Sequence, residues 1–332
     1  IPGYEILEEV ARGAMGIVYR TIAKDTNRHV ALKTPLAQYS SGPDLARLKN
    51  EYYFLTQIQH RNVVSVQKLF DHHGQWFVEM EFVDGVDFLR YVRAGLTVEG
   101  AFLDPTINLG AGSPAPGFDE ASSSATMSGA LDPARDPRPA AGGELADSQD
   151  LPRQAAPRRE LGPRDWDRLR SALAQLAEGL HFLHQHQIIH RDVKLSNVLW
   201  DRERDVLKLV DFGIARLLEN YGRSDAGATL RSFYTTPYAA PEQVRGLDSS
   251  FPADLHAFGV VAAALLAWRI PAQMFRRAEL GAFMAPFVNE VGDETAARKL
   301  VALLESLLDD APDQRPKAPN LELALREALE KL

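Results

Sequence analysis

The chain has 332 residues, of which 45% are hydrophobic and 25% are charged, a balance typical of a soluble globular protein with a sizeable core. The absence of cysteine excludes disulfides and cysteine-based metal sites, and the formal net charge of −8 disfavours a general nucleic-acid or anionic-membrane binder. The longest apolar run, 257–268, is too short to span a bilayer.

The first residues, Ile1-Pro2-Gly3, contain neither an initiator methionine nor a signal peptide, and we expect a cytoplasmic segment that can be a domain of a larger protein. Residues 4–36 are predicted to form strands. Within them, the run 11–19 (Ala-Arg-Gly-Ala-Met-Gly-Ile-Val-Tyr) places glycines between two β-prone segments. Glycine lets backbone N–H groups approach phosphate oxygens, although a glycine-rich turn also suits a plain hairpin.

The strand that follows ends in a lysine, and the next predicted helix carries an unusual glutamate. Lys33 closes the run Val-Ala-Leu-Lys, and its ordinary alternative is a solvated strand end. Glu51 shares one helical face with four apolar residues. These are Leu45, Leu48, Leu55 and Ile58. Because a buried unpaired carboxylate costs several kcal/mol, Glu51 is expected to have a cationic partner.

Two further segments precede the second half of the chain. The run 76–85 passes from a strand into a turn, and Asp87 then precedes a short predicted helix, 88–92, for which it can be the N-cap. Residues 101–160 are dominated by Pro, Ala, Gly, Ser and Arg without an apolar period, so we predict a disordered insertion. A tolerated spacer is favoured over an autophosphorylation or docking tail, because the longer loop costs only about 2 kcal/mol.

A long helix is predicted after the insertion, from Pro163 through the apolar positions up to Leu183. It contains or precedes three histidines, for which surface or capping roles are expected rather than metal binding. These are His181, His184 and His186.

The helix leads to the run His190-Arg191-Asp192-Val193-Lys194-Leu195-Ser196-Asn197, which is followed by a β-rich run and by Asp211-Phe212-Gly213. Loops at neighbouring strand ends would bring Asp192, Lys194, Asn197 and Asp211 around one small volume. One carboxylate and one amide suit Mg²⁺, and a second carboxylate beside a lysine suits a base that orients a hydroxyl. A single aspartate would more often be a turn or cap residue, but the joint spacing weakens that alternative.

The pattern His-x-Asp-x-x-x-x-Asn, a strand and then Asp-Phe-Gly resembles the signature of eukaryotic-type protein kinases. Lys194, two residues after Asp192, resembles the serine/threonine branch, and the Met-Gly-x-Val-Tyr ending of the glycine run is most similar to bacterial members. The resemblance implies an α+β, bilobal protein-kinase-like fold. It implies a small β-rich N-lobe with one key helix (1–83), a hinge and start of the C-lobe (84–100), the insertion (101–160) and a larger, mainly helical C-lobe (161–332).

The resemblance also implies a serine/threonine protein kinase that transfers the γ-phosphoryl group of ATP to a protein hydroxyl. Asp192 would orient that hydroxyl and Lys194 would stabilise the transferring group, while Asn197 and Asp211 would hold Mg²⁺ (or Mn²⁺). Lys33, paired with Glu51, would position the phosphates. The nucleotide-binding residues that the resemblance implies are Ala11, Gly13, Gly16, Val18, Ala31, Lys33, Met80, Glu81, Val83 and Asp87.

The resemblance also implies how individual residues of the nucleotide-binding set contact ATP. Ala11 stands where the family has its first glycine, so a stiffer loop is expected. The backbone of Glu81 and Val83 would bond the adenine edge, with Met80 at the back of the pocket. Asp87 is a candidate for the ribose hydroxyls, and the N-cap role stays equally open.

The later motifs concern the activation segment and its support. Thr235 resembles the threonine of the substrate loop, and Thr229 and then Ser232 are the phosphosite candidates, with plain loop roles as the alternative. Arg191 implies a phosphate acceptor for its guanidinium. The resemblance further implies an ion pair between an anchor glutamate and a late arginine, a carboxylate that steadies the catalytic loop, and a scaffold histidine. These are Glu242 with Arg315, Asp254 and His190.

The expected partners are a protein substrate and ATP, with no nucleic acid, no membrane contact by this segment, and a homodimer for trans-autophosphorylation. Two other functions share part of this pattern. A pseudokinase that binds partners without turnover is the alternative, but no required polar residue is missing. Kinases of small molecules lack the Ala-Pro-Glu anchor and the late arginine that are present here.

Overall fold

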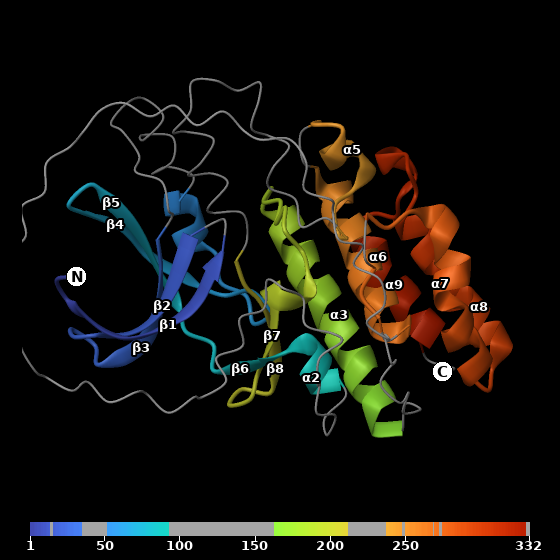
Figure 1. Cartoon of the computed structure of the whole chain (residues 1–332), viewed down its shortest axis with the longest axis horizontal. Coiled ribbons are helices and arrows are strands. Elements are labelled where there is room, and N and C mark those ends of the chain that lie inside the picture. The colour runs from blue at the N-terminus through green and yellow to red at the C-terminus, as the bar shows by residue number, and fades with distance from the viewer. Residues whose placement is uncertain are drawn as a thin grey trace, which may run out of the picture. The chain divides into compact units, whose positions relative to one another are not determined.

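The structure is a computed structural model that describes residues 1–13, 16–34, 52–92, 163–211, 237–247, 250–267, 269–271 and 274–329. All of these residues belong to one unit, built from 1–109 and 158–332 (Figure 1). The predictions made for Glu51, Thr229, Ser232, Thr235 and the 101–160 insertion lie outside the described residues.

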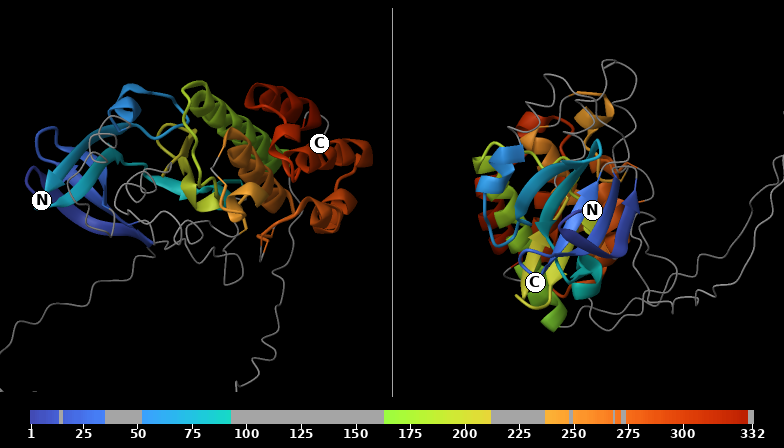
Figure 2. Two further views of the ribbon diagram at one scale, coloured as in Figure 1. Left: turned by 90° about the horizontal axis from the view of Figure 1, so that it is seen from above. Right: turned by 90° about the vertical axis from the view of Figure 1, so that its left-hand side faces the viewer.

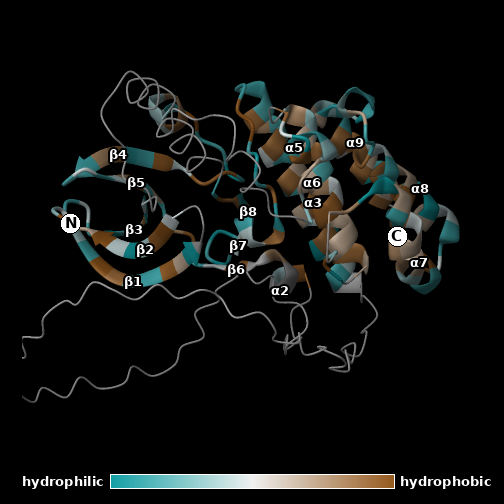
Figure 3. Ribbon diagram, turned by 45° about the horizontal axis from the view of Figure 1, so that its top comes forward, coloured by the Kyte–Doolittle hydropathy of each residue, from teal (hydrophilic) through white to brown (hydrophobic). Residues whose placement is uncertain are grey.

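An antiparallel sheet of five strands forms the N-terminal part. Its strands are β1 (Tyr4–Gly13), β2 (Gly16–Ala23), β3 (Arg28–Thr34), β4 (Val66–His72) and β5 (Gln75–Glu81), in the order β1-β2-β3-β5-β4. Figure 3 shows hydrophobic residues interleaved with hydrophilic ones along β1 and β2, as expected for strands with one covered face. The register pairs Ala31 with Met80 and Lys33 with Val78, which places the β3 lysine beside the strand that leads to the hinge.

The sheet curls so that its two outer strands approach each other (Figures 1 and 2). The ring of Tyr4 on β1 stacks on Phe70 of β4 at a centroid distance of 5.2 Å. The Tyr4 hydroxyl also donates to the buried carboxylate of Glu79 on β5. Gly16 starts β2 with a φ of 130°, a backbone conformation that side-chain-bearing residues rarely adopt, so the predicted loop needs glycine at this position.

A second, three-stranded sheet follows the first. Its strands are β6 (Gly85–Asp87), β7 (Val198–Asp201) and β8 (Val206–Leu209), in the order β6-β7-β8. The helical elements that accompany and follow it are α2 (Phe88–Val92), α3 (Pro163–Gln185), η1 (Leu195–Asn197), α5 (Pro241–Val244), α6 (Phe251–Ala267), α7 (Arg277–Glu290), α8 (Glu294–Leu307), η3 (Pro312–Gln314) and α9 (Ala318–Leu329). The described chain is therefore α+β, with a β-rich N-lobe and a mainly helical C-lobe.

Helix α6 forms the centre of the C-lobe. It is buried along nearly its whole length, as its continuous apolar sequence predicts, and it packs against α3, α7 and α8. A Cβ added at Gly259 would lie 3.0 Å from the Leu307 Cβ, so the glycine permits a close approach of α6 to α8. Among the described helices, none has the length and apolar character needed to cross a bilayer.

Helices α7 and the first turn of α8 occupy a region to which the sequence interpretation assigned nothing. Pro286 lies inside α7 and has no N–H to donate to the carbonyl of Ala282. The Arg269 guanidinium donates instead to the carbonyls of Ala282 and Phe283, at 3.3 and 3.0 Å. Helix α8 begins after Asp293, whose carboxylate accepts from two N–H groups of the first turn.

Candidate active site

The loop that carries Asp192 is held by a carboxylate from the buried helix α6. Asp254, in the first turn of α6, is 1% exposed and accepts from the backbone N–H groups of His190 and Arg191, both at 2.8 Å. The expectation that Asp254 steadies this loop is confirmed.

The same Asp254 carboxylate corrects the expectation for one histidine of α3. His184 is buried and its Nε2 lies 2.9 Å from an Asp254 oxygen, so a surface or capping role was wrong for this residue. Among the described residues, no group of three His, Cys, Asp or Glu side chains is arranged to hold a metal ion.

The His190 ring bonds to the backbone of Asp192 and to that of Val210, the residue just before Asp211. Its Nε2 lies 3.1 Å from the Val210 carbonyl, and its Nδ1 accepts from the Asp192 N–H at 3.3 Å. This pattern requires a neutral ring with the proton on Nε2. Burial, the largest effect, lowers the pKa of His190 although Asp254 and Asp192 act in the opposite direction. The scaffold role expected for His190 is confirmed.

Two residues that flank this connection have left-handed backbones. Arg191 has a φ of 71° and Asp211 a φ of 63°, and neither is a glycine. Such a conformation costs a non-glycine residue about 1–2 kcal/mol, and it is retained where surrounding contacts enforce it. Here those contacts come from Asp254 on one side and from the pairing of Asp211 with Lys33 on the other.

Asp192 gathers the polar residues of its own loop. The Lys194 ammonium lies 2.9 Å from Asp192 Oδ2, and the Asn197 amide nitrogen donates to the same oxygen at 3.0 Å and to the Asp192 carbonyl at 2.8 Å. Asp192 and Asn197 are 6% and 5% exposed. Since the side-chain nitrogen of Asn197 donates to Asp192, the side-chain oxygen, Oδ1, is the Asn197 atom that could bind a metal ion.

Lys33 reaches from β3 to Asp211, which follows β8. The two side chains form an ion pair, in which Lys33 is 5% exposed and Asp211 is 26% exposed. Burial pushes the pKa of Asp211 upward, but the Lys33 charge more than offsets this and the net pKa is lowered, so the carboxylate is ionised and suited to a cation. The sequence interpretation gave Lys33 a different partner, Glu51, which lies outside the described residues, and did not anticipate the pair with Asp211.

The remaining residues expected at the nucleotide lie on β1 to β3 and on the segment after β5. Ala11 pairs with Val18 across β1 and β2, and Ala31 and Met80 are buried neighbours on β3 and β5. The N–H of Glu81 donates to the Ser65 carbonyl at 2.9 Å, so an adenine contact by Glu81 would have to use its carbonyl.

The turn after Val83 depends on a glycine. Val83 itself is partly buried. A Cβ at Gly85 would lie 2.7 Å from the Trp200 carbonyl, so this tight contact excludes larger residues. Asp87 is the last residue of β6, and its backbone pairs with Leu199 of β7. The side chain of Asp87 lies outside the described part of the chain.

Glu242 of α5 forms a buried ion pair with Arg315. Arg315 donates from Nη1 and Nη2 to the two Glu242 oxygens, at 2.6 and 2.8 Å, and also to the carbonyls of Asp309 and Pro252. Burial acts to raise the pKa of Glu242, but the bonds from Arg315 outweigh it and the pKa is lowered. The expected pairing of Glu242 with Arg315 is confirmed.

The fold matches solved structures. The kinase domain of Mycobacterium tuberculosis PknI is similar to this chain with a TM-score of 0.60 and 19% identity, covering 99% of this chain and 97% of that chain. At this identity the likeness establishes the fold.

Sequence comparison gives the family. The profile of the family described as protein tyrosine and serine/threonine kinase matches residues 4–325, and the chain therefore belongs to this family. Members generally use ATP with a divalent cation.

Curated relatives include a probable serine/threonine-protein kinase PknB of Lactococcus lactis, 24% identical over 272 residues, and the serine/threonine-protein kinase PrkC of Bacillus subtilis, 25% identical over 271. The serine/threonine-protein kinase PknJ of Mycobacterium tuberculosis is 27% identical over 273 residues. Each alignment covers 81% of this chain, which spans only 32%, 31% and 34% of the three relatives.

Proposed function

We propose that this domain transfers the γ-phosphoryl group of ATP to serine or threonine hydroxyls of a protein substrate. The observation that carries the proposal is the grouping of Lys194 and Asn197 on Asp192, next to the Lys33–Asp211 ion pair. Lys194 and the names of the curated relatives favour serine and threonine over tyrosine.

Each residue of the group has a distinct role in this proposal. Asp192 accepts the proton of the acceptor hydroxyl. At the same time the hydroxyl oxygen forms a bond to the γ-phosphorus of ATP, and the bond from the γ-phosphorus to the ADP oxygen breaks. Lys194, beside Asp192, offsets the negative charge of the transferring group. Lys33 holds the α- and β-phosphates, and the pair with Asp211 keeps its ammonium at the phosphate end of the site.

The donor set also fits a divalent cation. Asp211 is ionised and partly exposed, and Asn197 has its nitrogen bonded to Asp192, so a carboxylate and an amide oxygen suit Mg²⁺ or Mn²⁺. When bound, the ion neutralises phosphate charge. Residues of the nucleotide set supply the rest of the site, with the Glu81 carbonyl and the Val83 backbone at the adenine edge.

The protein substrate, trans-autophosphorylation by a second copy, and modification of Thr229 or Ser232 are further parts of the proposal. We also propose that the domain works in the cytoplasm, where ATP is available. The polar residues whose loss defines a pseudokinase are present, so that alternative has no observation in its favour.

The proposal is tested by incubating the chain with ATP and Mg²⁺ and analysing the chain itself by mass spectrometry. Phosphoserine or phosphothreonine is expected, and chelation of the metal should abolish it. Asp310→Asn, an exposed aspartate far along the C-lobe sequence, is the matched control for Asp192→Asn and should keep the modification. Phosphotyrosine alone, or phosphorylation that persists in Asp192→Asn, would contradict the proposal.

A further inference from the structure

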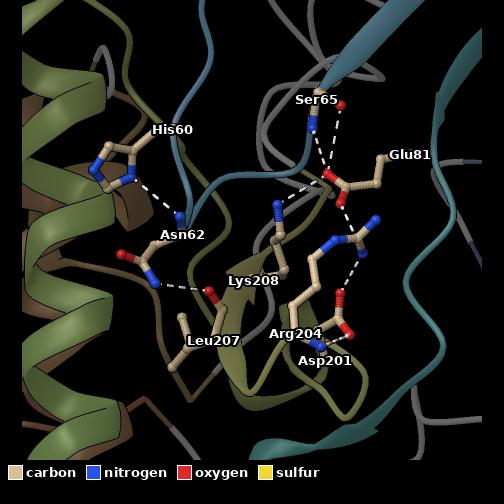
Figure 4. A network of polar contacts seen from close by, with 8 residues as sticks. All are labelled: His60, Asn62, Ser65, Glu81, Asp201, Arg204, Leu207 and Lys208. Atoms are coloured by element: carbon tan, nitrogen blue, oxygen red, sulfur yellow. Dashed lines mark hydrogen bonds and ion pairs between the residues drawn. The ribbon is translucent and has the colours of Figure 1, made fainter.

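The carboxylate of Glu81, where β5 ends, lies in a cluster of charged groups from two parts of the chain (Figure 4). Its Oε2 accepts from the Lys208 ammonium at 3.0 Å and from the Ser65 N–H at 3.2 Å. Its Oε1 lies 3.3 Å from Arg204 Nη1. The side chains of Glu81 and Lys208 are 14% and 8% exposed, so the attraction between them is weakly screened by solvent.

The β7–β8 turn presents Arg204 to this carboxylate. Asp201 is buried, and its Oδ1 accepts from the N–H groups of Glu203 and Arg204 at 3.0 and 3.1 Å, while its Oδ2 binds Arg204 Nη1 at 2.6 Å. Arg204 Nη1 therefore lies between the carboxylates of Asp201 and Glu81 (Figure 4). Hydrogen bonds within the turn thus fix its conformation, and Arg204 adds a contact from the turn to Glu81 at the end of β5.

The cluster connects the two ends of the proposed nucleotide site. Glu81 belongs to the backbone segment proposed for the adenine edge. Lys208 lies on β8, three positions before Asp211, at the proposed metal and phosphate end. Asp211 lies two residues beyond the end of β8, and the N–H of Val210, just before it, donates to the Asn197 carbonyl at 2.9 Å. We expect a displacement of Lys208 to reach Asp211 through this short, hydrogen-bonded segment.

Further bonds keep β8 beside the segment that leads into β4. The N–H of Val64 donates to the Leu209 carbonyl at 3.0 Å, and the Leu209 N–H donates to the Asn62 carbonyl at 2.8 Å. The Asn62 amide donates to the Leu207 carbonyl at 2.9 Å (Figure 4). These contacts hold β8 close to Ser65, and Ser65 in turn accepts from the Glu81 N–H at 2.9 Å. The ion cluster adds to this indirect connection a direct one between the Glu81 carboxylate and β8.

We propose that Glu81, Lys208 and Arg204 are positioning residues whose ion cluster sets the separation between the adenine end and the metal end of the nucleotide site. This inference rests on the proposed function. The cluster would therefore determine the affinity for a nucleotide that reaches both ends, and would have little effect on a ligand that occupies the adenine end alone.

The test measures the affinity of the whole chain for two probes by calorimetry: ADP with Mg²⁺, and adenosine without metal. Glu81→Gln keeps the shape of the side chain but removes its charge. We expect this substitution to weaken ADP binding about tenfold. The affinity for adenosine should stay within about twofold of the wild-type value, since that ligand does not reach Asp211.

Matched variants separate positioning from a loss of folding. Lys208→Met should reproduce the effect of Glu81→Gln, and the double variant should be no weaker than either single one, because both remove the same interaction. Lys208→Arg keeps the charge and should restore most of the ADP affinity. Arg204→Met removes the half-exposed partner and should have a smaller effect, and Glu294→Gln, in an exposed ion pair of α8, should have none.

Three results would overturn the inference. The first is an unchanged ADP affinity in all cluster variants. The second is an equal loss of adenosine and ADP affinity, which would restrict the cluster to supporting the hinge. The third is faster phosphorylation with unchanged ADP affinity, which would make the cluster a restraint on lobe movement. A wild-type chain that binds ADP with Mg²⁺ but transfers no phosphate would overturn the proposed function alone, and failure to bind ADP at all would overturn both.

Discussion

Replacing Arg315 by methionine would break its buried ion pair with Glu242. Arg315 has a side-chain exposure of 0% and Glu242 one of 4%, and the guanidinium contacts both carboxylate oxygens. The substitution leaves the Glu242 charge buried without its cation. It also removes the Nε donor to the Asp309 carbonyl and the Nη1 donor to the Pro252 carbonyl.

The expected loss follows from these contacts. Breaking a buried pair by removing one partner costs about 3–5 kcal/mol, so Arg315→Met should lower the free energy of unfolding by about 4 kcal/mol. Glu242→Gln should cost less, since an amide still accepts from the guanidinium and the two carbonyls keep their donor. The double variant should cost less than the sum of the single ones, because both remove the same interaction.

The assay is urea unfolding followed by circular dichroism, with midpoints compared at equal slope. Arg298→Met is the matched control, because Arg298 pairs with Glu294 on the surface with exposures of 71% and 65%. Exposed pairs contribute little, so this control should leave the midpoint nearly unchanged. If Arg315→Met lowered the free energy of unfolding no more than Arg298→Met, burial would not be what makes the Arg315–Glu242 pair strong.

Three other predictions concern pH, metal and the insertion. Burial, followed by the nearby Arg315 charge, lowers the pKa of His256 to about 4, below its unfolded value, so unfolding takes up a proton and stability should fall by about 2 kcal/mol between pH 7 and pH 5. His256→Phe should flatten this part of the stability profile, measured by urea unfolding at each pH, and an unchanged slope would be evidence against the assignment. Asp211→Ala should remove the Mg²⁺-dependent part of the thermal shift given by ADP, as measured by calorimetry with and without metal, and a shift that remains metal-dependent would contradict the role of Asp211. Replacing residues 101–160 by a short loop should leave the rate of autophosphorylation within about twofold, since closing a shorter loop favours the folded state, and a large loss of activity would show that the segment is more than a spacer.

The local parts of the site could be predicted because they depend on spacing along a short stretch of chain. Asp192 and Asn197 share one loop, and only the β7–β8 hairpin separates them from Asp211. Loop residues at neighbouring strand ends must lie close together, whatever the rest of the fold does. Two helices were predictable from local sequence as well. Residues 163–185 have apolar side chains at regular helical steps, and α6 is apolar along nearly its whole length.

Contacts between distant segments were harder to predict. The Lys33–Asp211 pair joins residues that are far apart in sequence. The apolar period of the helix predicted after Lys33 favoured Glu51 as its partner instead. His184 looked like one of three surface histidines because its carboxylate partner, Asp254, lies 70 positions away. Helix α7 has a proline inside it and lacks a clear apolar face, so no pattern indicated it.

The residues around Glu81 in the sequence gave no indication of the role of its side chain. An acidic residue at the end of a strand is usually exposed, and only the backbone of Glu81 was assigned a role. The partners that bury its carboxylate, Lys208 and Arg204, come from a hairpin more than 120 positions later. A signal existed in Lys208 itself, a charged residue within the otherwise apolar run of β8.

The role of Asp192 in phosphoryl transfer is measured most directly by the single-turnover rate of γ-phosphoryl transfer from labelled ATP to the chain itself, in the wild type and in Asp192→Asn. We expect a rate about 1,000-fold lower in the variant, with the affinity for ADP and Mg²⁺ within about threefold of the wild type, because Asp192 acts on the acceptor hydroxyl and not on the nucleotide. A rate within about tenfold of the wild type, or a loss of nucleotide affinity as large as the loss of rate, would contradict it.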